Sequence, residues 1–299
     1  MIPAPALPAA VSGERLVFDS PAGRLNVYVA GGGPPMLLVH SVNAAASAAE
    51  VAPLHEHYRQ SRTVFTPDLP GFGHSTRDPG VYTPRRMTDA IHAVLAQVRA
   101  RCGAAPVDAL ACSLSSEYLV RAAVEAPGAL RSIALVSPTG FRGNRTLRRP
   151  EGSTLELPGM HAVLRGPGWG GALFRGLTRP GVIRFFLEKT FGSRAIDEPM
   201  WAYAVATARQ PGAEHAPLQF LCGRLFSADI HTLYERLTLP VWMSHGVRGD
   251  FTDYRQKRLI ETRPNWRITV FDSGALPFFE DTAGFVTAWD AFLGTVEAG

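Results

Sequence analysis

Few of the residues that mark specialised protein classes occur in this sequence. Its three cysteines, Cys102, Cys112 and Cys222, are widely spaced and form neither a CxxC nor a Cys/His pattern. An odd and scattered set excludes a disulfide framework and provides no metal-ligand spacing. We therefore expect reduced, mostly structural thiols, and we recognise no cofactor or metal site.

Long apolar runs are also missing. No stretch reaches the roughly 20 apolar residues that a membrane-spanning helix requires. The first five residues have neither the charged region nor the apolar region of a secretory signal peptide. We expect a cytoplasmic protein without a membrane span.

Lysine is scarce, because Lys189 and Lys257 are the only lysines among 30 basic residues. The formal net charge is +4, and no basic run is flanked by aromatic residues, which argues against nucleic-acid binding. Residues 141–238 hold thirteen basic and eight acidic residues. An anionic or acyl-linked small molecule could bind to this excess of positive charge, but solvated surface arginines explain the excess more simply. The sequence leaves the oligomeric state open.

What the 299 residues do contain is an alternation of short apolar runs and helical patterns. This alternation predicts an α/β fold with a mostly parallel sheet flanked by helices. The expected strands cover residues 25–29, 36–39, 64–65, 107–111, 133–136, 240–245 and 266–271, and helices are expected near 83–101, 254–260 and 285–293.

The interval between the strands at 133–136 and 240–245 is too long for a simple crossover. Residues 141–238 have a helical pattern with Gly and Pro breaks and several aromatic residues. We expect them to form an inserted helical lid over the carboxyl edge of the sheet. The core would then consist of residues 1–140 and 239–299.

The segment Ala111-Cys112-Ser113-Leu114-Ser115 follows an expected strand and precedes a helix. Small residues two positions before and after a serine are typical of a nucleophile elbow, where the strained serine backbone leaves little room. The alternative is a serine that caps the helix. We favour Ser113 as a nucleophile.

A second motif, His40-Ser41-Val42-Asn43, follows the strand at 36–39. It resembles a His-Gly-x loop, so the backbone N–H groups of Val42 and Leu114 would form an oxyanion hole. We interpret His40 as a structural hydrogen-bonding residue rather than a base, and we place Asn43 in the lining of the site.

Two further segments complete the pattern. Residues 68–75 are similar to an Asp-x-Pro-Gly-x-Gly-x-Ser turn beside the site mouth, which places His74 there. Asp250 follows the strand at 240–245 and is our candidate for the triad acid, with Asp253 in reserve. Either aspartate could instead lie in a surface loop.

Taken together, these motifs resemble a lid-bearing α/β-hydrolase of the esterase and epoxide-hydrolase-like superfamily. The resemblance covers residues 15–295, and the insertion matches it poorly. It implies an α/β-hydrolase fold, a Ser113 nucleophile, an Asp250 acid and a histidine base after the last strand.

The base is where the pattern breaks. The expected Gly-His-x-Pro loop reads Gly274-Ala275-Leu276-Pro277, and all nine histidines lie at or before His245. Losing such a base costs on the order of a millionfold in turnover. His245, His74 and His40 are the candidate substitutes, with His245 foremost, although a histidine at a strand end is more often structural.

Three functional hypotheses follow. The first is a hydrolase of small ester-like or acyl substrates that uses Ser113, the Val42 and Leu114 amides, Asp250 and an unusual base such as His245. The second is a lyase, cyclase or isomerase that uses the oxyanion hole without acylation. The third is a ligand-binding homologue that has lost catalysis, since a fold does not fix a function.

Overall fold

The computed structural model describes residues 6–166 and 169–298, and it confirms the predicted fold class. An eight-stranded sheet has the order β1-β2-β4-β3-β5-β6-β7-β8, in which β2 pairs antiparallel with both of its neighbours, β1 and β4, and all other pairs are parallel. The strands are β1 (Glu14–Ser20), β2 (Gly23–Gly31), β3 (Pro35–Val39), β4 (Thr63–Asp68), β5 (Val107–Cys112), β6 (Leu130–Val136), β7 (Val241–Gly246) and β8 (Trp266–Phe271).

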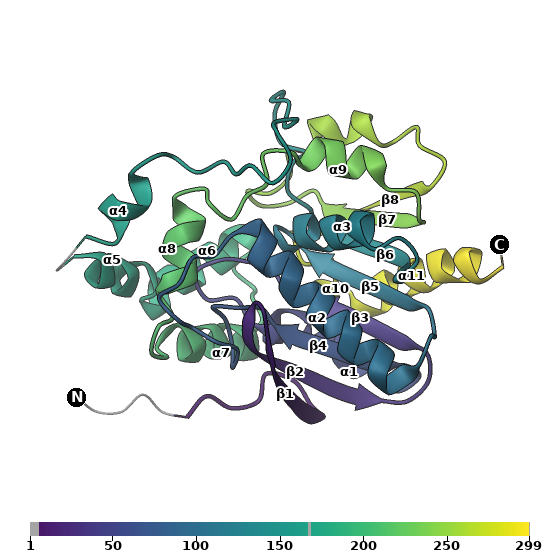
Figure 1. The fold of residues 1–299 in the computed structure, drawn as a ribbon, viewed down its shortest axis with the longest axis horizontal. Coiled ribbons are helices and arrows are strands. Elements are labelled where there is room, and N and C mark those ends of the chain that lie inside the picture. Colours follow the sequence, from purple (N-terminus) through teal and green to yellow (C-terminus); the bar gives the residue numbers. More distant parts are fainter. Residues whose placement is uncertain (1–5, 167–168, 299) are drawn as a thin grey trace.

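Helices cover both faces of this sheet (Figure 1). One face packs against α2 (Pro84–Cys102) and α3 (Ser115–Glu125). The opposite face packs against α1 (Ala52–Tyr58), α10 (Pro277–Glu280) and α11 (Thr282–Glu297). The strands β3, β5 and β6 are buried along nearly their whole length, as their continuous apolar runs predict for a parallel sheet covered on both sides.

Residues 141–238, which we call the insertion, connect β6 to β7. Their described part contains α4 (Met160–Leu164), α5 (Gly170–Leu177), α6 (Pro180–Phe191), α7 (Glu198–Ala208), α8 (His215–Leu221) and α9 (Ile230–Arg236). Helices α4 to α8 gather on one side of the molecule, at the left of Figure 1. A small apolar cluster of the insertion, which includes Phe174 and Ala204, packs against Ala45 just beyond β3. The insertion thus reaches the carboxyl edge of the sheet.

Two local features differ from the sequence-based expectation. The strand β1 was not expected, because it lies at the sheet edge and most of its side chains are exposed or half-buried, which hides the apolar alternation. The helix expected near residues 254–260 is instead a short 3₁₀ helix, η2 (Arg255–Leu259). Another short 3₁₀ helix, η1 (Ala48–Val51), immediately precedes α1.

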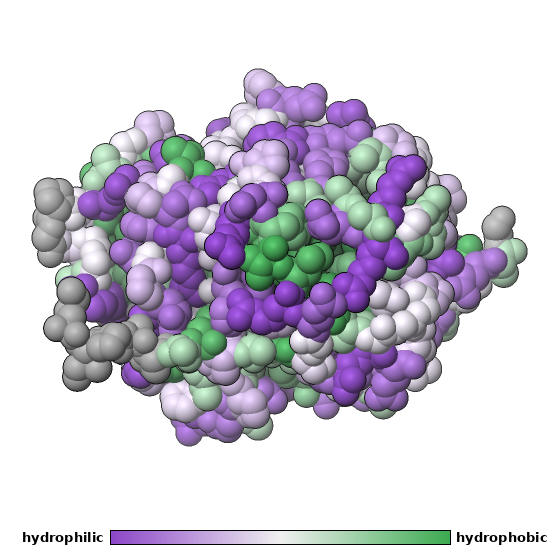
Figure 2. Space-filling model, turned by 60° about the horizontal axis from the view of Figure 1, so that its bottom comes forward, coloured by the Kyte–Doolittle hydropathy of each residue, from purple (hydrophilic) through white to green (hydrophobic). Residues whose placement is uncertain are grey.

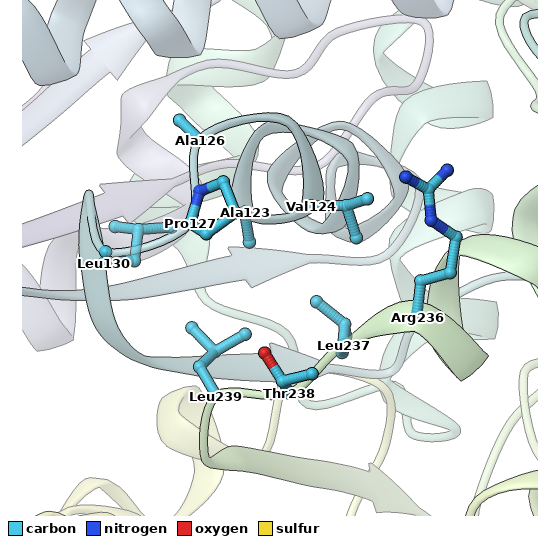
Figure 3. A pocket seen from close by; sticks show the side chains of 10 residues that line it. Ala123, Val124, Ala126, Pro127, Leu130, Arg236, Leu237, Thr238 and Leu239 are labelled. Atoms are coloured by element: carbon cyan, nitrogen blue, oxygen red, sulfur yellow. The ribbon is translucent and has the colours of Figure 1, made fainter.

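The outer surface is mostly hydrophilic in the view of Figure 2, where apolar residues gather in one central area. A shallow pocket of about 70 Å³ opens between the carboxyl end of α3, the start of β6 and residues 236–239 (Figure 3). It lies where the parallel strands begin, at the edge opposite Ser113. Across the described ranges, none of the helices has the length and hydropathy to cross a bilayer.

Candidate active site

Ser113 occupies a sharp turn between β5, which ends at Cys112, and α3, which begins at Ser115. Its φ of +52° lies in the left-handed region, which is costly for a residue with a side chain and recurs at functional sites. The Ser113 N–H donates to the Val136 carbonyl at 2.8 Å, which holds the turn on β6. Ala111 and Ser115 are fully buried, so only small residues fit on either side.

The Ser113 side chain is half-buried, and within the described ranges its hydroxyl has no hydrogen-bond partner. The backbone N–H groups of Val42 and Leu114 likewise have no protein acceptor there, although both residues are buried. Buried N–H groups without an acceptor are rare. They can serve an oxygen that becomes negatively charged during a reaction.

The loop that carries Val42 is fixed by Glu50, a residue that sequence reasoning missed. The Glu50 carboxylate accepts the Ser41 N–H at 2.9 Å and the Asn43 side-chain amide at 2.6 Å. Asn43 in turn accepts the Ala45 N–H at 2.8 Å. Asn43 therefore braces the loop, and no sequence pattern links Glu50 to it because the contact depends on how η1 packs.

Two of the three candidate bases have both ring nitrogens occupied. The Nε2 atom of His40 accepts the Leu69 N–H at 3.0 Å, and its Nδ1 atom lies 2.5 Å from the next carbonyl. His74 bridges the Tyr28 hydroxyl at 2.9 Å and the Leu7 carbonyl at 3.0 Å, and burial lowers its pKa. Both histidines therefore have a structural role, because their hydrogen bonds stabilise the surrounding backbone and turns.

His245 differs from them. Its side chain is 4% exposed, and its ring stacks on Tyr254 with centroids 4.0 Å apart and planes 16° apart. The Nδ1 atom lies 3.0 Å from the Gly246 carbonyl, which fixes Nδ1 as the protonated nitrogen. The Nε2 atom is buried without a partner in the described part of the chain. Burial lowers the His245 pKa, and the Lys257 charge lowers it further.

The structure does not bring either candidate acid to a histidine. The Asp250 side chain is 56% exposed and lies 3.6 Å from the Lys189 ammonium. Asp253 accepts hydrogen bonds from the Gly143 N–H and the Arg255 guanidinium, and the latter holds the Asp253 pKa below its usual range. Neither carboxylate contacts His245 in the part of the chain that the structure describes.

Ala275, at the expected histidine position, is buried between the insertion and β6. Its N–H donates to the Thr190 carbonyl of α6 at 2.8 Å, and its carbonyl accepts the Ser137 hydroxyl at 2.7 Å. Ser137 has a φ of +48°, and it shares a positive φ only with Ser113 among the described residues other than glycine. Sequence reasoning treated Ser137 only as the end of a strand.

Ser113, Ser137 and His245 occupy one row at the carboxyl edge of the sheet. The register pairs Cys112 with Val136 and Val136 with Ser244, so the three residues that follow lie on neighbouring strands. The residues two positions earlier, Ala111, Leu135 and Met243, all belong to the core cluster on the α3 face. His245 lies within β7, so its side chain continues that face. Ser113 and Ser137 follow the ends of their strands and have positive φ, so alternation does not set the direction of their side chains.

No group of three or more His, Cys, Asp or Glu side chains in residues 6–166 and 169–298 is arranged to hold a metal ion.

Comparisons with known proteins agree with the observed fold. A family model described as the alpha/beta hydrolase family matches residues 28–288. Among solved structures, an esterase from Exiguobacterium antarcticum has a TM-score of 0.70 at 16% identity, with 96% of this chain and 100% of that chain covered. The Cif epoxide hydrolase from Acinetobacter nosocomialis has a TM-score of 0.71 at 16% identity, with 94% and 88% covered.

A thermophilic esterase from Thermogutta terrifontis is similar as well, with a TM-score of 0.69, 18% identity, and 95% and 99% of the two chains covered. At such identities the similarity concerns the fold. No curated protein sequence matches the chain.

Proposed function

Because the chain belongs to the alpha/beta hydrolase family, we propose that it is a serine hydrolase that cleaves small ester-like or acyl substrates with Ser113 as the nucleophile. One observation carries the proposal: Ser113 has a φ of +52° between β5 and α3 and a half-buried hydroxyl that no described residue engages. A serine kept in this strained conformation without a structural hydrogen bond is available for chemistry.

The oxyanion hole of the site would consist of the backbone N–H groups of Val42 and Leu114. Attack by the Ser113 oxygen on an ester carbonyl moves negative charge to the carbonyl oxygen, which these two donors are free to bind. One such donor typically contributes a factor of about 100 to 1,000 in turnover. The Glu50 and Asn43 hydrogen bonds keep the loop in place before substrate arrives.

The base in this proposal is His245 instead of a residue at position 275. The Gly246 carbonyl takes the orienting role of an acid by accepting the Nδ1 hydrogen, which leaves the Nε2 lone pair able to accept a proton. Because the His245 pKa is lowered, the imidazole is neutral at pH 7. Without a carboxylate partner, the imidazolium is less stabilised, and we expect slow turnover.

The insertion would act as the lid of this site, since α6 contacts the loops after β7 and β8. The similar structures include two esterases and an epoxide hydrolase, which supports a small-molecule substrate. The basic excess of the insertion is compatible with an anionic or acyl-linked one.

Intact-protein mass spectrometry after incubation with a fluorophosphonate tests the proposal. We expect one covalent adduct on the wild-type protein and none on Ser113→Ala. His245→Gln should slow labelling at least about 100-fold, the range expected for a general base, whereas His74→Gln should label at the wild-type rate. A wild-type protein that stays unlabelled, or a Ser113→Ala variant that labels equally, contradicts the proposed function.

A further inference from the structure

Large apolar side chains stay exposed in the first part of the insertion and at the end of α8. Leu157, Val163 and Trp169 are 55%, 56% and 44% exposed, and Leu221 is 46% exposed. We call these four side chains the apolar patch. None of the five residues of α4 is buried, although four of them are apolar. Single exposed apolar residues are common, but a group of them marks a binding surface.

The four side chains of the apolar patch come from segments that touch. The Leu157 N–H donates at 3.0 Å to the carbonyl of the residue after α8, whose last residue is Leu221. Gly170, next to Trp169, packs on the Leu164 carbonyl at the end of α4, where a Cβ atom would lie only 2.6 Å from that oxygen. Figure 1 shows α4 and α5 at the left end of the molecule, with α8 beside α4 and α11 at the opposite end.

The same part of the chain is positively charged. Residues 157–179 include Arg165, Arg175 and Arg179 but no aspartate or glutamate. All three arginines are exposed, and none forms an ion pair within the described ranges. By contrast, Arg184 and Arg224 of the same insertion each pair with a glutamate. The charge of the three arginines is therefore free to meet a partner.

Helix α5 fixes the orientation of this region. Phe174 is buried in the apolar cluster that packs against Ala45, whereas the adjacent Arg175 is exposed. The helix thus turns a charged side away from the molecule. Helices α4 and α5 have five and eight residues, far fewer than the roughly 20 that cross a bilayer. A membrane contact through these helices is consequently limited to the bilayer surface.

Apolar side chains interleaved with unpaired cations fit a lipid surface best. Elements that bind there bury Trp and aliphatic side chains at the boundary between headgroups and acyl chains, and their Arg and Lys side chains bind anionic headgroups. An anionic bilayer thus matches both halves of this surface. A soluble polyanion would neutralise the arginines but would leave the apolar patch in water.

We propose that the apolar patch and the three arginines dock the protein on an anionic phospholipid bilayer. The Trp169 ring and the aliphatic side chains enter the boundary below the headgroups, and the guanidinium groups bind lipid phosphates. Docking does not involve Ser113. It therefore goes beyond the proposed function and can be measured without any catalytic activity.

Flotation of the full-length protein with lipid vesicles tests the proposal. Vesicles of phosphatidylcholine mixed with phosphatidylglycerol should bind the protein, and vesicles of phosphatidylcholine alone should bind it at least about tenfold more weakly, because the cations lose their partners. High salt should release the protein from the anionic vesicles, since it screens exposed charges. Ser113→Ala should bind as the wild type does.

The cationic half is tested by replacing all three arginines of the surface with glutamine. Each arginine near an anionic surface contributes about fivefold to binding, so the triple variant should bind on the order of 100-fold more weakly. The control is Arg24→Gln, Arg99→Gln, Arg258→Gln, which removes the same net charge at exposed positions outside the insertion. It should bind nearly as tightly as the wild type.

The apolar half is tested by Val163→Ser, Trp169→Ser. Binding should fall at least about tenfold, because less apolar area leaves water on docking. Val17→Ser, Val270→Ser changes exposed valines on β1 and β8 and is the control, which should bind normally. The tryptophan emission of the wild type should also shift to shorter wavelengths on anionic vesicles, and Trp169→Phe should lack this shift.

Equal binding to both kinds of vesicle, or no binding to either, would overturn the proposal. Equal weakening by the control arginine variant would do the same, because it would assign the effect to net charge alone. If the arginine variant fails to bind while Val163→Ser, Trp169→Ser binds fully, the surface fits a soluble polyanion and lipid docking is wrong. None of these outcomes depends on fluorophosphonate labelling of Ser113, so the two proposals can fail independently.

Discussion

Glu117, one turn into α3, is a fully buried carboxyl group close to the elbow. Its oxygens accept the Thr139 hydroxyl and the Ser227 N–H, the latter at 2.7 Å. Burial is the dominant effect and raises the Glu117 pKa from 4.5 to about 7, although both hydrogen bonds and the Arg121 charge oppose it. Near neutral pH the site therefore contains a carboxyl group that is close to half protonated.

This pKa predicts a pH-dependent stability. Because the folded-state pKa is the higher one, the folded protein holds the Glu117 proton more tightly than the unfolded chain does. The free energy of unfolding should therefore fall as pH rises from about 4.5 to about 7, by an amount on the order of 3 kcal/mol. Urea unfolding at pH 5 and pH 8 measures this difference.

Glu117→Gln provides the control for that measurement, because the amide keeps the shape but does not titrate. The difference between pH 5 and pH 8 should shrink in this variant. An unchanged difference would show that other groups cause it.

At the residue scale, the sequence could suggest only those parts of the candidate site that lie in short continuous motifs. Ser113, Leu114 and Val42 could be proposed from the sequence because each lies in a short turn motif next to a strand end. Glu50 and Ser137 could not be found in this way. Glu50 contacts a loop seven to nine residues before it in the chain, and Ser137 lies beside Ser113 only because of the register between β5 and β6. The exposure of the Asp250 side chain could not be predicted from the sequence either, because it depends on how α6 packs against the loop after β7.

At the scale of elements, a buried ion pair joins α3 to the start of α9. The Arg121 guanidinium lies 2.7 Å from the Asp229 carboxylate, and both side chains are at most 4% exposed. Asp229 also accepts the Gly152 N–H at 2.9 Å. The pair therefore connects the elbow helix with two parts of the insertion.

Removing one partner should be costly because it leaves the other charge buried. We expect Arg121→Met to lower the free energy of unfolding by about 3–5 kcal/mol. The double variant Arg121→Met, Asp229→Leu should recover part of this loss, which chemical denaturation of both variants can measure. Equal destabilisation of the single and double variants would contradict an uncompensated charge as the cause.

The elements themselves were predictable where the apolar pattern is long enough, even at the edge of the sheet. The expected strand at 266–271 has the bounds of β8, an edge strand, and the expected helix at 83–101 is shifted by one residue from α2. The other edge strand, β1, was missed because its apolar residues form a run of only three, from Leu16 to Phe18. Within the insertion the individual helices could not be delimited, since Gly and Pro breaks show where a helix stops but not how the pieces pack.

At the scale of the whole molecule, Arg77 connects the core to the insertion. From the turn after β4, its guanidinium donates to the Gly73 carbonyl, and to the carbonyl and hydroxyl of Thr207 on α7 at 2.9 and 2.7 Å. These contacts hold α7 beside the residues that follow Asn43, where a narrow hollow includes Ala45 and Ala208.

Arg77→Met should loosen α7 without unfolding the sheet. Each lost hydrogen bond is worth about 1 kcal/mol, so hydrogen exchange of the α7 amides should accelerate at least about tenfold. Exchange in β5 and β6 should stay at wild-type rates. Arg194→Met, which removes an exposed arginine from the same insertion, is the matched control. Equal exchange in both variants would show that Arg77 does not hold the helix.

The last helix, α11, also covers the middle of the sheet, where Trp289 stacks with Trp242 of β7 and the Tyr58 hydroxyl donates to Asp290 at 2.9 Å. Its partners in the same core cluster include Leu38 and Leu110, which are made far earlier on the ribosome. A nascent chain thus exposes this apolar face until α11 has emerged. A chaperone that shields apolar surface during this interval should improve the yield of this protein in cells.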